Sequence, residues 1–215
     1  MLTVEEAREG ILSRVEPLGI ERVEIMGALG RVLAEPVVSR ATIPPWPNSS
    51  MDGYAVRAAD TNGTVELAVV GRIIAGAMPS RALGAGESMR IFTGAPLPDG
   101  ADAVVPQEDV TAKGDRVTIR GRIAPGAYVR PAGEDVRTGD VVVQPGGSIG
   151  AAEIGLLATL GYSQVRVYRR PRVAILSTGN ELADLGTQPG PAQIPNTNTY
   201  SLMAQVTEAG AEPFN

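Results

Sequence analysis

Polar side chains that could do chemistry gather in one short segment, Asn48–Tyr54, which contains Ser50 and the carboxylate of Asp52. Three prolines between residues 44 and 47 precede this segment and hold its backbone in an extended path. A reactive group needs a rigid support, so this arrangement favours a functional carboxylate at Asp52. An Asp–Gly pair is also common in turns for conformational reasons alone, and the sequence leaves that alternative open.

Two other turns contain groups of the same kind. Thr93 and Gly94 follow an apolar run that is typical of a strand, where a hydroxyl and a backbone amide can face an anion. Asp135 lies in a charged turn, Arg130–Asp135, of the kind that is usually only solvated. A plain connection between strands explains each turn at least as well, so neither turn identifies a site alone.

A third group follows the apolar run RVAIL at residues 172–176. Its members offer hydroxyl, backbone or carboxylate groups: Ser177, Thr178, Gly179 and Glu181. Ligands of open α/β sheets gather at the carboxyl ends of strands, so this position favours function. Asn198 lies in the next connection, where a helix N-terminus offers amides to an anion, although simple capping explains an asparagine there equally well.

The 215-residue chain contains neither histidine nor cysteine, which excludes a thiolate nucleophile, a disulfide and a structural zinc site. Chemistry must therefore come from carboxylates, basic side chains, hydroxyls and backbone amides, assisted by a hard cation such as Mg²⁺. This set of groups suits the handling of phosphate or another oxyanion. The net charge of −5 includes no basic stripe, so nucleic-acid binding is not expected. GxGxxG and P-loop motifs are also absent from the sequence.

The elements that would position these groups begin with a helix. Thr3 and Glu6 have the spacing of a capping box, and an apolar stripe continues to Leu18. A second short helix is expected near Met26–Leu33, before Pro36. The proline-rich stretch that runs through residues 43–54 is expected to have no regular structure.

Four apolar segments predict strands, at residues 65–76, 88–94, 102–110 and 115–121. Gly, Pro and Asp turns separate them, which indicates a small barrel or sandwich inserted between helical segments. Helical character returns at Ala151–Leu160, and Gly161 ends it.

The last part predicts the beginning of an α/β domain. RVAIL is expected to be a strand buried on both faces of a parallel sheet, followed by a helix that Asn198 caps and Gly210 ends. Glu212–Phe214 then opens another strand. One βα unit cannot cover such a sheet, so we expect the rest of this domain to lie outside the chain. Neither a signal peptide nor a membrane span is expected, which predicts a cytoplasmic protein with no membrane partner.

Taken in order, these segments resemble the molybdopterin molybdenumtransferase family of molybdenum cofactor biosynthesis, which includes the E domain of gephyrin. The resembling segments are GALGRVLAEPV (27–37), NSSMDGYAV (48–56), FTGAPLPDGADAVVPQE (92–108), RPAGEDVRTGD (130–140), IGLLATLG (154–161), RPRVAILSTGNEL (170–182) and NTNTYSL (196–202). They cover nearly the whole chain in family order, which makes the resemblance far more specific than any one motif.

The resemblance implies a multidomain fold with α+β and α/β parts that assembles as a homodimer. A helical and extended dimerisation domain would comprise residues 1–45 and 138–169, with a small β-barrel-like domain inserted at 46–137. A three-layer α/β molybdopterin-binding-like domain would begin at residue 170 and be truncated at residue 215.

The resemblance also implies the last step of molybdenum cofactor biosynthesis, in which molybdate enters adenylylated molybdopterin and AMP is released. Mg²⁺ would assist, and a molybdopterin adenylyltransferase would be the upstream partner. The catalytic residues would be Asp52, Thr93 and Glu181, with Asp52 and Glu181 as candidate metal ligands. The substrate-binding residues would be Ser50, Gly94, Asp135, Ser177, Thr178, Gly179 and Asn198.

Within this assignment, Asp52 and Glu181 would orient metal, water or substrate, and Thr93 would contact the anion or the pterin. Asn180 stands where many relatives have Asp, which argues against a second carboxylate role there. Two other interpretations stay open. The chain could belong to a gephyrin-like scaffold, or it could be a fragment of the enzyme that is inactive by itself.

Overall fold

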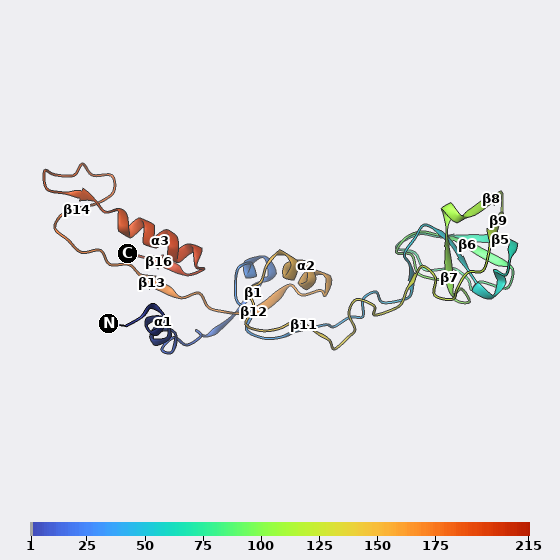
Figure 1. Cartoon of the computed structure of the whole chain (residues 1–215), viewed down its shortest axis with the longest axis horizontal. Coiled ribbons are helices and arrows are strands. Elements are labelled where there is room, and N and C mark those ends of the chain that lie inside the picture. Colours follow the sequence, from blue (N-terminus) through green and yellow to red (C-terminus); the bar gives the residue numbers. More distant parts are fainter. Residues whose placement is uncertain (1) are drawn as a thin grey trace. The chain divides into compact units, whose positions relative to one another are not determined.

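The computed structural model describes residues 2–215, and the chain divides into two compact units (Figure 1). The first, which we call the discontinuous unit, combines the residues up to Val37 with Val141–Asn215. The second, the sheet unit, is Val38–Asp140. A strand-rich segment thus interrupts a unit that contains the α-helices, in agreement with the predicted mixture of α and β parts. The finer boundaries at residues 46, 137 and 170 and the three-layer arrangement stay predictions.

The elements of the discontinuous unit are short. They are α1 (Val4–Leu12), β1 (Ile20–Glu24), the 3₁₀ helix η1 (Ile25–Ala28), β11 (Val141–Val143), α2 (Ala151–Thr159), β12 (Gln164–Tyr168), β13 (Arg172–Ala174), β14 (Leu182–Ala183), β15 (Ile194–Pro195), α3 (Thr197–Glu208) and β16 (Glu212–Phe214). β1 pairs with β12 in antiparallel fashion, whereas β13 with β16 and β14 with β15 are parallel pairs.

The first predicted helix begins where expected but ends early. In α1, the Glu6 N–H donates to Thr3 Oγ1 at 3.2 Å and the Thr3 N–H donates to Glu6 Oε2 at 2.8 Å, which is the predicted capping box. The helix ends at Leu12, so the predicted continuation to Leu18 was wrong. Pro17 has no N–H to donate and cannot extend the helix through this region.

The second predicted helix, Met26–Leu33, was also too long, because only η1 (Ile25–Ala28) forms there. Gly30 has a φ of +72°, a left-handed backbone that does not continue a helix. Ala151–Leu160, in contrast, matches α2 closely, and Gly161 follows it with a φ of +74°. Among residues 2–215, none of the helices combines the length and the apolar content needed to cross a membrane.

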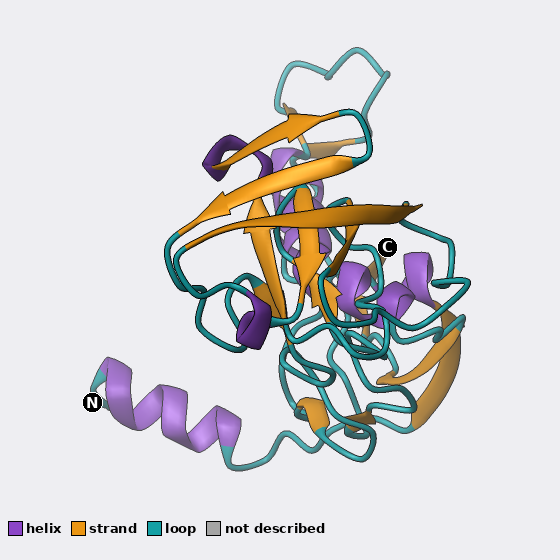
Figure 2. Ribbon diagram, turned by 90° about the vertical axis from the view of Figure 1, so that its right-hand side faces the viewer, coloured by secondary structure: helices purple, strands orange, loops and turns teal. Residues whose placement is uncertain are grey.

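A six-stranded sheet forms the centre of the sheet unit (Figure 2). Its strands are β4 (Gly53–Val56), β5 (Thr64–Ile73), β6 (Glu87–Ile91), β7 (Ala103–Pro106), β8 (Val110–Lys113) and β9 (Arg116–Arg120). Their spatial order is β7-β4-β6-β5-β9-β8, and only β5 and β6 are parallel neighbours. All four predicted strand segments are confirmed, while closure of the sheet into a barrel stays a prediction.

Shorter elements of the sheet unit are β3 (Asn48–Ser49), η2 (Ala58–Asp60), η3 (Gln107–Asp109) and β10 (Val129–Arg130), while β2 (Val37–Val38) spans the boundary between the two units. β3 pairs with β10, and Gly53 and Tyr54 begin β4. The prediction that residues 43–54 lack regular structure was therefore wrong for these positions. Their partners come from distant parts of the chain, which local proline content does not reveal.

Both faces of the six-stranded sheet are packed, because successive strand residues point to opposite sides. One face carries Tyr54, Val56, Leu67, Ala103, Val105, Val117 and Ile119, and the other carries Ala55, Ile73, Met89, Ile91 and Val104. β4 and β7 contribute to both faces. The strand pairing places Gly53 opposite Ile91 of β6 and Pro106 of β7, and this register fixes the position of Asp52 beside them.

The predicted strand RVAIL is shorter and more exposed than expected. β13 covers only Arg172–Ala174, and it is parallel to β16 as predicted. Leu176, predicted to be buried, is 84% exposed. The predicted burial on both faces was wrong because β13 and β16 form a two-stranded sheet, which offers little surface to cover them.

Candidate functional site

Two hydrogen bonds join Thr93 to Asp52. The backbone N–H and the hydroxyl of Thr93 both donate to Asp52 Oδ1, each at 2.9 Å. Asp52 directly precedes β4 and Thr93 closely follows β6, and these antiparallel strands place Gly53 opposite Ile91. This register brings the two predicted site residues together although 41 positions separate them in sequence.

Hydrogen bonds hold the Asp52 loop, which we define as Asn48–Asp52, from two directions. The Gly94 N–H donates to Ser49 O at 2.8 Å. On the other side, the N–H and the hydroxyl of Ser50 both donate to Tyr128 O, each at 3.0 Å. The Gly94 amide and the Ser50 hydroxyl, both predicted to bind substrate, therefore serve as donors within the protein in this structure.

Gly53 is needed for close packing of two strands, whereas the sequence had suggested a glycine in a turn. It pairs with Pro106 of β7, and a Cβ atom at Gly53 would lie only 2.0 Å from Val105 O. A side chain would therefore collide with the backbone of β7. The glycine allows β4 and β7 to approach closely, and this contact fixes the residue that follows Asp52.

The Asp52 carboxyl is partly buried, and its pKa lies below the ordinary aspartate value. The Thr93 N–H makes the largest contribution, the Thr93 hydroxyl comes next, and the nearby Arg90 guanidinium adds attraction, while burial acts in the opposite direction. Asp52 is consequently ionised at neutral pH. Thr93 fixes Oδ1, and Oδ2 accepts no hydrogen bond from another residue in the described part of the chain.

Asp135, predicted to bind substrate, is engaged with Arg130. Arg130 Nη2 donates to both Asp135 oxygens at 2.7 and 2.8 Å, and Arg130 Nε donates to Glu134 Oε2 at 2.7 Å. Glu134 and Asp135 together raise the pKa of Arg130 above its usual value. β10 places Arg130 opposite Asn48, at the edge of the Asp52 loop. The acidic turn therefore orients a cation beside that loop.

A second group of predicted residues lines a cavity of about 290 Å³ in the discontinuous unit. The predicted members are Ser177, Thr178, Glu181 and Asn198, and the other lining residues are Leu176, Leu182, Ile194, Pro195, Asn196, Thr197 and Leu202. The cavity thus lies between the loop that follows β13 and the first turn of α3. Ser177 Oγ lies 2.6 Å from Thr199 Oγ1, which ties these two segments together.

Gly179 supports this cavity without lining it. A Cβ atom at Gly179 would lie 2.3 Å from Glu181 Oε1, so the Glu181 carboxylate rests against the bare backbone of this glycine. A larger residue would displace that carboxylate.

Asn196 caps α3, and the prediction that Asn198 does so was wrong. Asn196 Oδ1 accepts from the Thr199 N–H at 3.3 Å, and the helix begins at Thr197. Asn198 instead lies in the first turn and borders the cavity. Asparagine stands at both positions, so the residue type alone does not distinguish the cap from its neighbour.

Sequence reasoning also missed Arg90. Its neighbours Met89 and Ile91 are in the core, so strand alternation puts Arg90 on the other side from them, and it pairs with Tyr54 of β4. This alternation, together with the proximity of Arg90 to Thr93 in sequence, was the available signal.

The described residues do not by themselves form the Mg²⁺ site implied by the resemblance. Within residues 2–215, no group of three or more acidic side chains is arranged to hold a metal ion. Asp52 and Glu181 are separate carboxylates that belong to different units. Mg²⁺ in proteins commonly uses one or two carboxylates together with substrate phosphates, so each would be at most one ligand of an ion held mainly by other groups.

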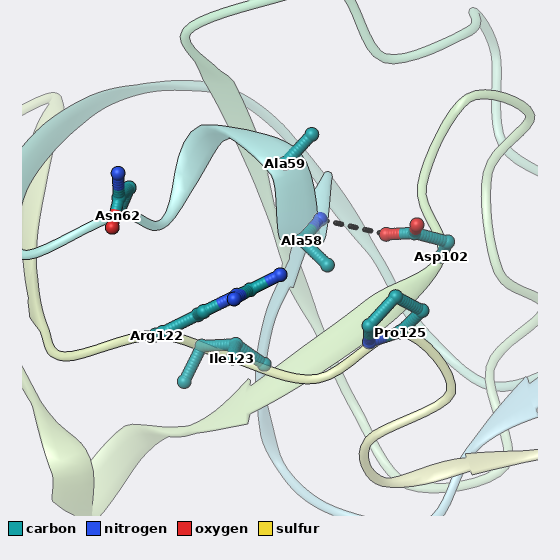
Figure 3. Close-up of a pocket in the computed structure, with 7 residues that line it drawn as sticks. All are labelled: Ala58, Ala59, Asn62, Asp102, Arg122, Ile123 and Pro125. Atoms are coloured by element: carbon teal, nitrogen blue, oxygen red, sulfur yellow. Dashed lines mark hydrogen bonds between the residues drawn. The ribbon is translucent and has the colours of Figure 1, made fainter.

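A separate cavity of about 390 Å³ in the sheet unit contains none of the predicted site residues (Figure 3). Its lining residues are Ala58, Ala59, Asn62, Asp102, Arg122, Ile123 and Pro125. Asp102 Oδ1 accepts from the Ala58 N–H at 2.7 Å, so this carboxylate fastens η2 to the loop before β7. That structural role accounts for Asp102, and the cavity is not part of the candidate site.

Comparison with known proteins relates the whole chain to one group. A relative from Nostoc sp., named molybdopterin molybdenumtransferase, is 44% identical over 199 residues, which are 90% of this chain and 46% of that protein. A relative of the same name from Haemophilus influenzae is 36% identical over 100% of this chain and 55% of its own length. The chain therefore spans about half the length of the curated relatives it matches.

Solved structures give the same result. A molybdopterin biosynthesis MoeA protein from Pyrococcus horikoshii aligns with 100% of this chain and 59% of its own, with a TM-score of 0.93 and 32% identity. A second crystal structure of this type aligns with a TM-score of 0.84 and 37% identity, over 100% of this chain and 56% of its own. The family model described as MoeA N-terminal region (domain I and II) matches residues 2–161. By sequence and by structure, this chain is a member of the MoeA N-terminal region family.

Proposed function

We propose that this chain is part of an enzyme that inserts molybdate into adenylylated molybdopterin and releases AMP, in the cytoplasm. Its family membership supports a role in molybdenum cofactor biosynthesis, because the relatives are named molybdopterin molybdenumtransferase. The observation that carries the proposal to a particular residue is the ionised Asp52 carboxylate, which Thr93 fixes by one oxygen.

Asp52 is suited to orient a reacting group. Release of AMP requires cleavage of a phosphoric anhydride, a reaction in which positioning of the nucleophile is a large part of catalysis. An ionised carboxylate with Oδ1 fixed presents Oδ2 in a defined direction, where it can accept a hydrogen bond from an attacking water and so orient it. The Thr93 hydroxyl already donates to Asp52, so its role in this proposal is to hold the carboxylate, and only its acceptor lone pairs remain for substrate.

The cavity of the discontinuous unit is suited to bind part of the pterin substrate. The hydroxyls of Ser177 and Thr178 and the amide of Asn198 can donate to phosphate or carbonyl oxygens, and the N-terminus of α3 favours negative charge. The Glu181 carboxylate can accept from N–H groups or hold a cation. A ligand with a phosphate at one end and N–H donors at the other would therefore use both kinds of group.

A homodimer is part of the same proposal. No residue of α1 is buried in the described chain, and Val4, Ile11 and Leu12 are 80%, 65% and 62% exposed. An amphipathic helix with an uncovered apolar face needs a partner surface. The adenylylated substrate would come from an adenylyltransferase, which is the class of reaction that makes such an anhydride.

Release of AMP from adenylylated molybdopterin, with and without molybdate, tests the function. We expect the complete protein to release AMP in a molybdate-dependent manner and the 215-residue chain to release none. Molybdate-independent release, or none by the complete protein, would contradict the proposal. Binding of a receptor peptide without AMP release would favour the scaffold interpretation.

A further inference from the structure

Arg90 connects several groups that surround Asp52. Its Nη1 donates to Gly53 O at 3.2 Å, and its Nη2 donates to Gln107 Oε1. The guanidinium also lies over two aromatic rings, 5.1 Å from the centroid of Tyr54 and 4.9 Å from that of Phe92. The side chain is partly buried, so these contacts hold a planar cation in one orientation.

The partners of Arg90 are also the neighbours of Asp52. Gly53 follows Asp52 in the chain, and the Gln107 N–H donates to Asp52 O at 3.0 Å. Arg90 therefore binds the carbonyl of Gly53, the residue after Asp52, and the side chain of Gln107, whose N–H donates to the Asp52 carbonyl. Thr93 binds the carboxylate of Asp52, whereas Arg90 binds groups that hold the backbone of Asp52.

We propose that Arg90 is a positioning residue, which fixes the backbone of Asp52 through Gly53 and Gln107 and so directs the carboxylate that Thr93 holds. The contribution of Arg90 to catalysis rests on the proposed function. The effect of Arg90 on the Asp52 loop is independent of that function. At least two N–H groups of Arg90 are already committed to protein acceptors. This commitment argues for an internal role over direct contact with substrate.

The fork of arginine is needed for this role. A lysine would keep the positive charge, but its donors all lie on one nitrogen, whereas arginine reaches Gly53 and Gln107 from two different nitrogens of a planar group that also stacks on the rings. Charged groups near this contact include the Asp52 carboxylate, Arg72 over the same Phe92 ring, and Glu108, whose Oε1 accepts from Gln107 Nε2 at 3.1 Å. If Arg90 acted only through its charge, Arg90→Lys should keep the wild-type behaviour of the Asp52 loop. If Arg90 acts by positioning, Arg90→Lys should lose it.

Arg72 offers a matched control. Its guanidinium lies over the same Phe92 ring, 4.7 Å from the centroid, but it forms no hydrogen bond with Gly53 or Gln107. Arg72→Ala removes a stacked cation from the same face of the sheet and leaves the Asp52 loop intact.

Amide hydrogen exchange by NMR on the 215-residue chain tests the proposal directly. In Arg90→Gln and Arg90→Lys, we expect the Thr93 and Gln107 amides, both bonded to Asp52, to exchange about tenfold faster, the size expected when a charge-assisted hydrogen bond is lost. Gln107→Ala should accelerate the Thr93 amide in the same direction, and Arg72→Ala should leave both amides unchanged. Wild-type exchange in Arg90→Lys, or equal acceleration in Arg72→Ala, would overturn the proposal.

Kinetics of the complete protein then separate positioning from substrate contact. Arg90→Lys should lower kcat for AMP release by about 10- to 100-fold with little change in KM, as expected for a misplaced catalytic group. A raised KM with an unchanged kcat would instead identify Arg90 as a substrate contact and contradict the inference. If the wild-type complete protein releases no AMP, the proposed function fails, while the exchange result still decides the role of Arg90 in the loop.

Discussion

Thr93 binds a single oxygen of Asp52 with two donors, its backbone N–H and its hydroxyl, both at 2.9 Å from Oδ1. The N–H is part of the main chain and persists in any variant except proline, whereas the hydroxyl belongs to the side chain. The two contributions can therefore be separated by mutation. The same hydrogen bonds stabilise the ionised form of Asp52, which links this contact to the pH dependence of stability.

The stability of the sheet unit should depend on the Asp52 charge. Because the folded pKa is lowered, the carboxylate contributes stability above its unfolded pKa of about 3.9, and this contribution is lost as the pH falls through the lower folded pKa. Asp52→Asn should therefore lower the free energy of unfolding at neutral pH, and its difference from wild type should shrink below about pH 4. Urea unfolding across this range measures the effect.

Asp99→Asn is the control for that experiment. It removes the same charge from an exposed side chain that accepts no hydrogen bond from another residue in the described chain. A constant difference between Asp52→Asn and wild type at every pH would contradict the assigned pKa shift.

Gly53→Ala should destabilise the sheet unit strongly. The added methyl group would lie 2.0 Å from Val105 O, and backbone cannot yield as a side chain does, so we expect a loss of at least about 2 kcal/mol in the free energy of unfolding. Gly71→Ala is the matched control in the same sheet, because its Cβ would lie 3.7 Å from Met89 Cγ. That variant should change stability by less than about 1 kcal/mol. Equal effects in the two variants would contradict the close approach of β4 and β7.

Substitutions of the two asparagines at the start of α3, Asn196 and Asn198, should have different effects on the stability of the helix. Asn196→Ala removes the cap and should cost about 1 kcal/mol of local stability, seen as faster exchange of the Thr199 amide. Asn198→Ala should change stability by less than about 0.5 kcal/mol, since its side chain is exposed at the cavity. In the proposed function, only this second variant lowers affinity for the pterin substrate without destabilising the helix. A larger stability loss in Asn198→Ala would reverse the assignment.

Local sequence patterns predicted the elements of the sheet unit well and their environment less well. Apolar segments between Gly, Pro and Asp turns identified β5, β6, β7 and β9, because these signals are contained within each strand and its flanking turns. The exposure of Leu176 depends on how many strands surround β13, which the pattern of RVAIL does not encode. The contact of Asp52 with Thr93 similarly depends on the pairing of β4 with β6, for which neither segment carries a local signal.

The candidate residues came from the order of motifs in a known family more than from their individual chemistry. The structure adds what that order could not supply: Ser50 donates its hydroxyl to Tyr128, and Asp135 is paired with Arg130. Both were expected to bind substrate, and both have partners within the protein. The Ser50 partner, Tyr128, lies 78 residues away beside the β3–β10 pair, which no local pattern marks. Asp135 and Arg130 are only five residues apart, so the charged turn itself was the available signal for their pairing.

Molybdate-dependent AMP release by the complete protein, compared between wild type, Asp52→Asn and Thr93→Val, tests the role of the Asp52 carboxylate most directly. Asp52→Asn removes the charge, and we expect kcat to fall by about 100-fold. Thr93→Val keeps the N–H bond to Oδ1 and loses the hydroxyl, so its kcat should fall less, by about tenfold. Asp99→Asn should retain the wild-type rate. A wild-type kcat in Asp52→Asn would contradict the account, because the proposed reaction would then proceed without the one carboxylate that Thr93 holds.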